Sequence, residues 1–223
     1  MHSDLFVVKP EGILDLFQSA AALNASLLKV GMDDLGKNGL TYVVLRIKYQ
    51  VFRQIPKDSE VIVTTWPNPK GKIRFLRQFE IKDLDGNLMV LGSSLWVLMD
   101  LKTRRIMKTD NFDYQTDTLY EEKNFDIEDK IDLSDIEFKY VKDYQVSRDD
   151  IDRVGHLNNT KYLKMLYEVQ SVAIKELTID YIKEVKYNDI VKLYLGSKDN
   201  YEYLIGKKDE TICFAIKYMK ESD

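Results

Sequence analysis

The chain has 223 residues, of which 44% are hydrophobic and 31% charged, with only 10 glycines and 4 prolines. This balance suits a globular protein with a sizeable core, and it excludes disordered, collagen-like and disulfide-rich chains. The formal net charge of −4 argues against a general nucleic-acid binder. The one cysteine, Cys213, excludes an intramolecular disulfide and a multi-cysteine zinc site, and we expect it in the core.

The amino-terminal residues predict no export signal, because they carry no basic segment and the apolar run at 5–8 is too short. No stretch approaches the roughly 18 apolar residues of a membrane helix. We therefore expect a cytoplasmic protein that does not enter a membrane.

The first half of the sequence predicts one helix followed by antiparallel strands. Apolar residues recur with the helical period over 13–30, and Gly31 is placed to end that helix. β-Branched and aromatic residues then predict strands, joined by short turns, at 40–54, 61–66, 73–82 and 88–101. Gly92, inside the last strand, predicts a β-bulge.

Residues 109–137 are rich in carboxylates with interspersed aromatic residues, which indicates a solvated connector pinned by its apolar side chains. The second half then repeats the pattern of the first, with a strand at 138–147, a helix at 160–176 and strands at 177–185, 190–196, 201–206 and 211–219. A helix with antiparallel strands, present twice, favours an α+β protein with two helix-wrapped sheets. We therefore predict domains at 1–108 and 138–223.

The turn between the first strand and the helix of the second half has the most chemical content. Gly155 permits a tight turn there, and Asn158 or Asn159 can cap the helix that follows. The first N–H groups of that helix, with the positive end of its dipole, would suit a developing oxyanion.

Two titratable residues stand in the same turn. Asp152 and His156 are four residues apart, near enough on a bent loop to share a substrate or a water molecule. A purely structural helix cap is the alternative interpretation. The histidine weakens that alternative, because an imidazole in a glycine turn has few packing reasons to be there.

The segment DIDRVGHLNNTKYL, which begins at Asp150, resembles the Asp-x-Asn-x-His-Val-Asn-Asn-x-x-Tyr segment of the acyl-acyl carrier protein thioesterases in their shorter bacterial form. The resemblance covers most of the chain, including IPKDSEVIVTTWP, RFLRQFEIKDLDGN, SSLWVLMDLKTRRI and ELTIDYIKEVKYNDIV. It implies two tandem hot-dog domains, each a long helix wrapped by an antiparallel β-sheet. It also implies hydrolysis of fatty acyl thioesters of acyl carrier protein in fatty acid biosynthesis, with no metal or other cofactor.

Carried over by position, the resemblance implies a catalytic set of Asp152, His156 and Glu184, in which either carboxylate can be the base. Taken alone, Glu184 lies in an alternating segment and is equally well explained as a surface charge paired with a lysine. Val185 occupies the place where plant members carry a cysteine, so no thiol nucleophile is expected.

Asn158, Asn159 and Val154 fall on positions that the resemblance assigns to substrate binding. Val154 departs from the family, which has asparagine there, and a valine can neither donate a hydrogen bond nor position water. We therefore expect a slow enzyme. A non-catalytic acyl-thioester-binding protein and an acyl-CoA thioesterase remain alternatives, and a hot-dog dehydratase is a weaker one.

Two basic clusters stand out in this acidic chain: Lys70, Lys72, Arg74 and Arg77, and Lys102, Arg104, Arg105 and Lys108. A solvated face explains them in general. The more specific hypothesis is that they form a docking surface for acyl carrier protein, whose acidic surface would be attracted by the opposite charge. The residues leave open whether the protein forms a homodimer.

Overall fold

The structure is a computed structural model that describes residues 7–109, 119–152 and 155–221. Contacts within it divide the chain into two compact units. The first comprises Met1–Leu14, Gln54–Lys57 and Asp129–Asp223, and the second comprises Asp15–Arg53 and Asp58–Glu128. No helix in the described ranges is long and apolar enough to cross a membrane.

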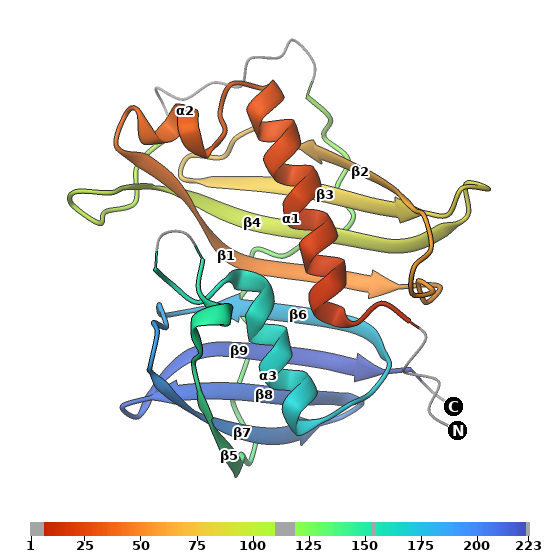
Figure 1. Cartoon of the computed structure of the whole chain (residues 1–223), viewed down its shortest axis with the longest axis vertical. Helices are drawn as coiled ribbons and strands as arrows, with labels where there is room; N and C mark the ends of the chain where they lie inside the picture. Colours follow the sequence, from red (N-terminus) through yellow and green to blue (C-terminus); the bar gives the residue numbers. More distant parts are fainter. Residues whose placement is uncertain (1–6, 110–118, 153–154, 222–223) are drawn as a thin grey trace. The chain divides into compact units, whose positions relative to one another are not determined.

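The second unit is an antiparallel sheet with a helix against one face (Figure 1). The strands lie in the order β2-β3-β4-β1, and the elements are α1 (Pro10–Leu27, of which the part from Asp15 belongs here), α2 (Met32–Gly36), β1 (Leu40–Val51), β2 (Ile62–Pro67), β3 (Arg74–Lys82) and β4 (Leu88–Asp100). The predicted strands are thus all present. The predicted helix begins earlier and ends at Leu27, and Gly31 precedes α2.

Aromatic rings join α1 to this sheet. The ring of Phe17 stacks on Phe79 of β3 at 4.3 Å between centroids, and it meets the edge of Tyr49 of β1 at 6.5 Å. Phe17 approaches β4 at Gly92, where an added Cβ would lie 2.3 Å from the ring. Gly92 therefore serves close packing. The predicted bulge at this position is wrong, because the register of β1 and β4 shifts between Val44 and Arg46 instead.

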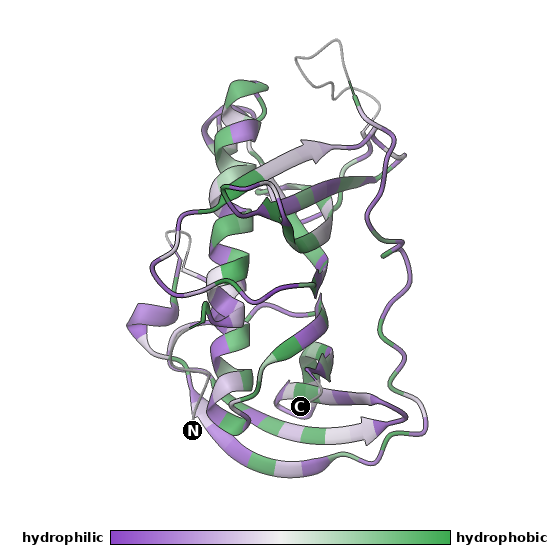
Figure 2. Ribbon diagram, turned by 90° about the vertical axis from the view of Figure 1, so that its right-hand side faces the viewer, coloured by the Kyte–Doolittle hydropathy of each residue, from purple (hydrophilic) through white to green (hydrophobic). Residues whose placement is uncertain are grey.

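Residues 119–128 of the connector lie against the opposite face of the same sheet, as Figure 2 shows from the side. Phe125 and Ile127 pack against Leu76 and Leu95. The amide of Asn124 donates to the carbonyl oxygens of residues 79 and 92 at 2.8 and 2.9 Å, a contact that the apolar pattern does not predict. This part of the connector is therefore held by partly buried hydrogen bonds as well as by its apolar side chains.

The first unit is built from an antiparallel sheet in the order β6-β9-β8-β7-β5, with α3 across it (Figure 1). Its elements are β5 (Lys139–Gln145), the 3₁₀ turns η2 (Arg148–Asp150) and η3 (Asn159–Lys161), α3 (Tyr162–Val169), β6 (Ile174–Tyr181), β7 (Ile190–Lys198), β8 (Tyr201–Lys208) and β9 (Thr211–Lys220). The predicted α+β class with two helix-and-sheet units is confirmed. The predicted domain limits at 108 and 138 stay a prediction.

One element of the first unit differs from its prediction. The helix expected over 160–176 ends at Val169, and β6 begins at Ile174. Apolar residues keep the helical period to Ala173, but Ile174 pairs with Lys220 of β9, and a β-branched residue is favoured in a strand. Sheet pairing therefore decides this boundary.

The close approach at Gly92 yields a stability prediction. Gly92→Ala should lower the free energy of unfolding by about 1–3 kcal/mol, because the stacked Phe17 ring cannot move away from the new methyl group. Urea denaturation measures the change. Gly36→Ala is the control, since a Cβ there meets nothing within 4 Å. Equal effects of the two variants would contradict the packing account.

Candidate active site

The predicted motif folds into a closed loop between η2 and η3. The N–H of Asn158 donates to the carbonyl oxygen of Asp150 at 2.9 Å, and that of Asp152 donates to the carbonyl oxygen of His156 at 2.8 Å. Gly155 has φ +87°, a conformation that favours glycine, so its predicted place in a tight turn is confirmed. Asp152 and His156 therefore lie on two arms of the motif that are bonded to each other.

A second segment brings Glu184 to this loop. The N–H of Leu157 donates to the carbonyl oxygen of Val185 at 2.8 Å, and His156 forms an antiparallel bridge with Lys186. The Nε2 atom of His156 then lies 3.3 Å from Oε2 of Glu184, with the side chains 27% and 41% exposed. The structure thus pairs an imidazole with a carboxylate, both of them partly exposed.

Asp152 has a different role in the geometry from Glu184. Its Oδ1 accepts a hydrogen bond from the backbone N–H of His156 at 3.0 Å. This bond fixes the peptide that carries the imidazole. The Asp152 carboxylate therefore orients His156, whereas Glu184 contacts the imidazole directly.

Asn158 caps the turn that leads into α3. Its side-chain oxygen accepts from the N–H of Thr160 at 3.1 Å, and its carbonyl oxygen accepts from the N–H of Lys161 at 2.9 Å. The carbonyl oxygen of Asn159 accepts from the hydroxyl of Tyr181 at 2.9 Å. The N–H groups of Asn158, Thr160 and Lys161 are therefore all bonded. Among the described residues of this turn, the N–H of Asn159 is the one that has no acceptor.

Two residues that the sequence interpretation left out of the site lie beside it. Burial raises the pKa of Tyr162, and the nearby carboxylates of Glu184 and Asp152 raise it further. The carbonyl oxygen of Cys213 accepts from the N–H groups of Ile182 and Lys183. Burial also raises the pKa of the Cys213 thiol, which keeps it protonated and unsuited to nucleophilic attack.

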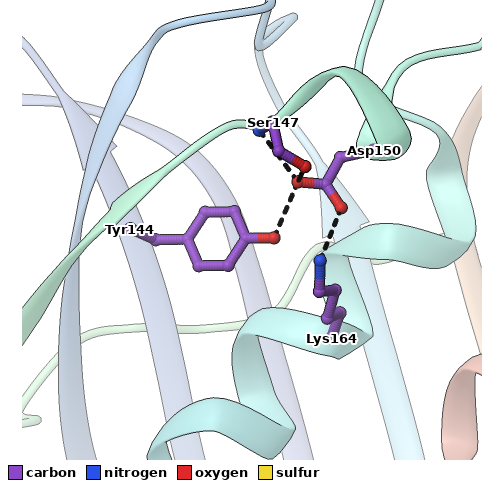
Figure 3. Close-up of polar contacts among 4 residues, drawn as sticks. All are labelled: Tyr144, Ser147, Asp150 and Lys164. Carbon is purple, nitrogen blue, oxygen red and sulfur yellow. Dashed lines mark hydrogen bonds and ion pairs between the residues drawn. The ribbon is translucent and has the colours of Figure 1, made fainter.

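A buried polar cluster stands behind the loop (Figure 3). The Asp150 carboxylate is 1% exposed and is surrounded by donors. Its Oδ2 accepts from the hydroxyl of Tyr144 at 2.8 Å and from the N–H and hydroxyl of Ser147 at 3.0 and 2.7 Å, and its Oδ1 is 2.8 Å from Nζ of Lys164. Sequence spacing can predict the pairing of Ser147 with Asp150, because these two residues form a capping box. It does not predict that Tyr144 and Lys164 join them.

The cluster shifts the titration of its members. Burial alone would raise the pKa of Asp150, but hydrogen bonds from Lys164, Ser147 and Tyr144 outweigh it and lower that pKa to about 2. The hydrogen bond to Asp150 raises the pKa of Lys164. Burial and the Asp150 carboxylate raise the pKa of Tyr144 to about 12. The cluster is therefore a neutral tyrosine with an ion pair over the whole neutral range.

Val154 lies outside the described residues, so its predicted substrate contact stays a prediction. Within residues 7–109, 119–152 and 155–221, no group of three or more His, Cys, Asp or Glu side chains is arranged to hold a metal ion.

The structure brings the two basic clusters together. Thr109 donates its N–H to the carbonyl oxygen of Lys72 and its hydroxyl to that of Gly71, which joins the end of the second cluster to the first. The exposed members are Lys72, Arg74, Lys102, Arg104, Arg105 and Lys108, with Lys70 half-buried.

Arg77 does not belong on this surface, contrary to the sequence-based expectation. It is only 8% exposed, and its guanidinium donates to Asn24 of α1 at 2.8 Å and to Thr65 of β2 at 3.2 Å. Arg74 points outward and pairs with Glu128. The docking hypothesis therefore retains Lys70, Lys72, Arg74, Arg104 and Arg105, without Arg77.

Comparisons with known proteins match both halves of the chain. A family model described as the acyl-ACP thioesterase N-terminal domain matches residues 7–113, and one described as the C-terminal domain matches residues 133–221 (ACP, acyl carrier protein).

Curated relatives align over most of this chain. A chloroplastic acyl-[acyl-carrier-protein] hydrolase of Cuphea viscosissima is 25% identical over 82% of this chain and 48% of its own length. A chloroplastic palmitoyl-acyl carrier protein thioesterase of Arabidopsis thaliana is 28% identical over 68% of this chain and 40% of its own length. The chain thus spans about half the length of the curated relatives it matches.

Solved structures show the same fold. A crystal structure of an acyl-ACP thioesterase from Bacteroides thetaiotaomicron has a TM-score of 0.82 at 19% identity, covering 97% of this chain and 96% of that one. A 12:0-ACP thioesterase from Umbellularia californica has a TM-score of 0.79 at 18% identity, covering 100% and 93%. The predicted tandem hot-dog fold is confirmed.

The Asp150 cluster yields a pH prediction. A folded-state pKa below the unfolded value of 3.8 stabilises the protein above pH 3.8, and this contribution is lost as the pH falls through about 2. Asp150→Asn should therefore lower the free energy of unfolding by about 2 kcal/mol at pH 7, and the deficit should shrink towards pH 2.5. Denaturant titrations at several pH values measure it, with the exposed neighbour Asp149→Asn as control. A deficit that stays constant down to pH 2.5 would contradict the assignment.

Proposed function

Because the chain belongs to the acyl-ACP thioesterase family, we propose that it is a thioester hydrolase that releases free fatty acid from acyl carrier protein. The observation that carries the proposal is the contact between His156 and Glu184, 3.3 Å apart on a loop whose backbone is bonded at both arms. A thioester is already activated, so the protein needs to supply a positioned water, a proton acceptor and oxyanion stabilisation. We propose that this release serves fatty acid biosynthesis, because the substrate class is an acyl chain held on acyl carrier protein.

The geometry favours Glu184 as the base. Asp152 is engaged with the backbone N–H of His156, whereas the partly exposed Glu184 lies against the imidazole. Glu184 accepts a proton as the water oxygen bonds to the thioester carbon. The carbon–sulfur bond then breaks, and the departing thiolate takes the proton that His156 relays from Glu184. The products are one carboxylic acid and one thiol, and no covalent intermediate forms on the protein.

The N–H of Asn159 is the candidate oxyanion donor. The other amides of the turn, which belong to Asn158, Thr160 and Lys161, already donate to acceptors within the loop. The sequence-based hypothesis assigns oxyanion stabilisation to several N–H groups at the helix start, and the structure reduces these candidates to one. The loss of a single such donor costs about 3 kcal/mol in comparable sites, so a one-donor site fits a slow enzyme.

The carrier protein is proposed to dock on the joined basic clusters. Exposed cations from 70–74 and 102–108 lie together at one end of the β3–β4 pair, because Thr109 bonds to Gly71 and Lys72. Opposite charge steers association and raises its rate even where it adds little affinity. Because the cations come from two separate segments, they suit the acidic face of a carrier protein, although the phosphates of coenzyme A also carry negative charge.

A non-catalytic acyl-thioester-binding protein is the second candidate, and Val154 in place of the family's asparagine is the observation that favours it. Binding of acyl-ACP without release of free acid by the wild-type protein would establish this alternative.

The catalytic assignment predicts matched losses of rate. His156→Ala and Glu184→Gln should each lower kcat on acyl-ACP by about 100-fold or more, as expected for a lost acid–base group. Cys213→Ala should stay within about threefold of wild type, because its thiol is protonated and not used. Free acid released from acyl-ACP of several chain lengths is the measurement. Full activity of a folded His156→Ala variant would refute the assignment.

The docking hypothesis predicts a substrate-dependent effect. The double variant Lys72→Glu/Arg105→Glu should raise KM for acyl-ACP by about fivefold or more at low salt, and raise KM for acyl-CoA, whose phosphates are also anionic, by much less. Lys139→Glu, a charge reversal at an exposed residue of β5, is the control. Equal effects on both substrates would show that the basic surface does not read the carrier protein.

A further inference from the structure

The Asp150 cluster contains more than a helix cap requires. A capping box needs only a side-chain acceptor, which a neutral asparagine also supplies. Here the acceptor is a charged carboxylate at 1% exposure, and a lysine from α3 and a tyrosine from β5 converge on it. Burying a charge is costly unless it is fully paired, so this arrangement calls for a reason beyond the cap.

The backbone of Asp150 leads directly to the catalytic loop. Its carbonyl oxygen accepts from the N–H of Asn158, which closes the loop at its base. The next residue, Ile151, bridges Leu157, and the residue after that, Asp152, is bonded to His156 through both its N–H and its carboxylate. Any movement of the Asp150 peptide is therefore transmitted to the imidazole through consecutive paired residues.

Lys164 supplies the other end of the connection. It lies in α3, the helix that follows the loop through the turn capped by Asn158. The ion pair with Asp150 thus joins the residue before the loop to the helix after it. Tyr144 and Ser147 attach the same carboxylate to the end of β5 and the segment that follows.

We propose that Asp150 is a positioning residue that, through Lys164 and Tyr144, holds the loop so that His156 faces Glu184. The inference rests on the proposed thioester hydrolysis for its kinetic consequence, but not for its structural one. Asp150 does not contact the substrate. Its removal should lower the rate of the chemical step while leaving substrate binding largely intact.

The chain offers a matched control for this ion pair. Lys142 of β5 and Glu168 of α3 form a second pair at the same N–O distance, 2.8 Å, between a strand and a helix that the cluster also joins. Both side chains of that pair are about 40% exposed, and neither residue belongs to the loop. Lys142→Met therefore removes a comparable ion pair without touching the connection to His156.

The first readout is spectroscopic and needs no turnover. The chain contains two histidines, so the imidazole carbon–proton signal of His156 is assigned by its loss in His156→Gln. In Asp150→Asn this signal should shift or broaden, and hydrogen exchange at the His156 and Asn158 amides should accelerate by about tenfold or more. Lys142→Met should leave all three unchanged.

The second readout is kinetic. Asp150→Asn should lower kcat by about 10-fold to 100-fold with KM within about twofold, as expected for a misplaced catalytic group. Lys164→Met should have a smaller effect in the same direction, and Lys164→Arg, which keeps the charge, should restore most of the rate. If Asp150→Asn fails to fold, the two Lys164 variants carry the test.

The two proposals fail separately. A wild-type protein that hydrolyses no thioester would refute the proposed function, and the spectra alone would then decide the positioning role. An unchanged His156 signal and unchanged amide exchange in folded Asp150→Asn, or in Lys164→Met if Asp150→Asn does not fold, would overturn that role, whatever the rates. An equal response in Lys142→Met would overturn it too, because the effect would then come from loosening β5 against α3.

Discussion

A buried carboxylate needs hydrogen-bond donors for its oxygens, and in the first unit this requirement determines the local structure around Asp150. Four donors from Tyr144, Ser147 and Lys164 converge on it, drawn from the end of β5, the η2 turn and α3. Once these partners are in place, the loop that begins at Asp150 has one end fixed, and its closure by Asn158 follows. The contact of Leu157 with Val185 then sets the distance from His156 to Glu184.

The packing of the sheet supports the site from beneath. A Cβ on Gly206 of β8 would lie 2.0 Å from the ring of Phe214, so only glycine admits the ring at this point. Phe214 in turn meets Tyr162 edge to face at 5.2 Å, and the carboxylates of Glu184 and Asp152 raise the pKa of this buried tyrosine. Gly92 and Phe17 repeat the same solution in the other unit. A strand glycine opposite a ring is thus a shared packing device of both units.

The sequence predicts the strands well, because alternation and turn residues are local properties. The sequence-based prediction is wrong where a residue distant in the chain determines the local structure. The helix expected to reach residue 176 stops at Val169, since Ile174 has a strand partner in β9, and Gly92 shows no bulge, since its function is to admit Phe17. The periodicity of a segment reveals neither the strand in β9 that pairs with Ile174 nor the ring of Phe17 that packs on Gly92.

The site divides in the same way. The turn at Gly155 and the candidates Asp152 and His156 follow from local chemistry, whereas only the resemblance to a known family singles out Glu184. The burial of Arg77 and the convergence of Lys164 and Tyr144 on Asp150 depend on tertiary contacts. A lysine on a helix or an arginine in a basic run looks the same in sequence whether it is solvated or buried, so these assignments needed the structure.

In the proposed reaction, water activated by Glu184 and His156 attacks the thioester directly. Rapid-quench measurement of both products from one acyl-ACP substrate, together with the intact mass of the protein, tests it. Direct attack by water predicts that thiol and free acid appear at the same rate and that the protein never gains the mass of the acyl group. A burst of thiol ahead of the acid, with an acylated protein in the mass spectrum, would contradict it.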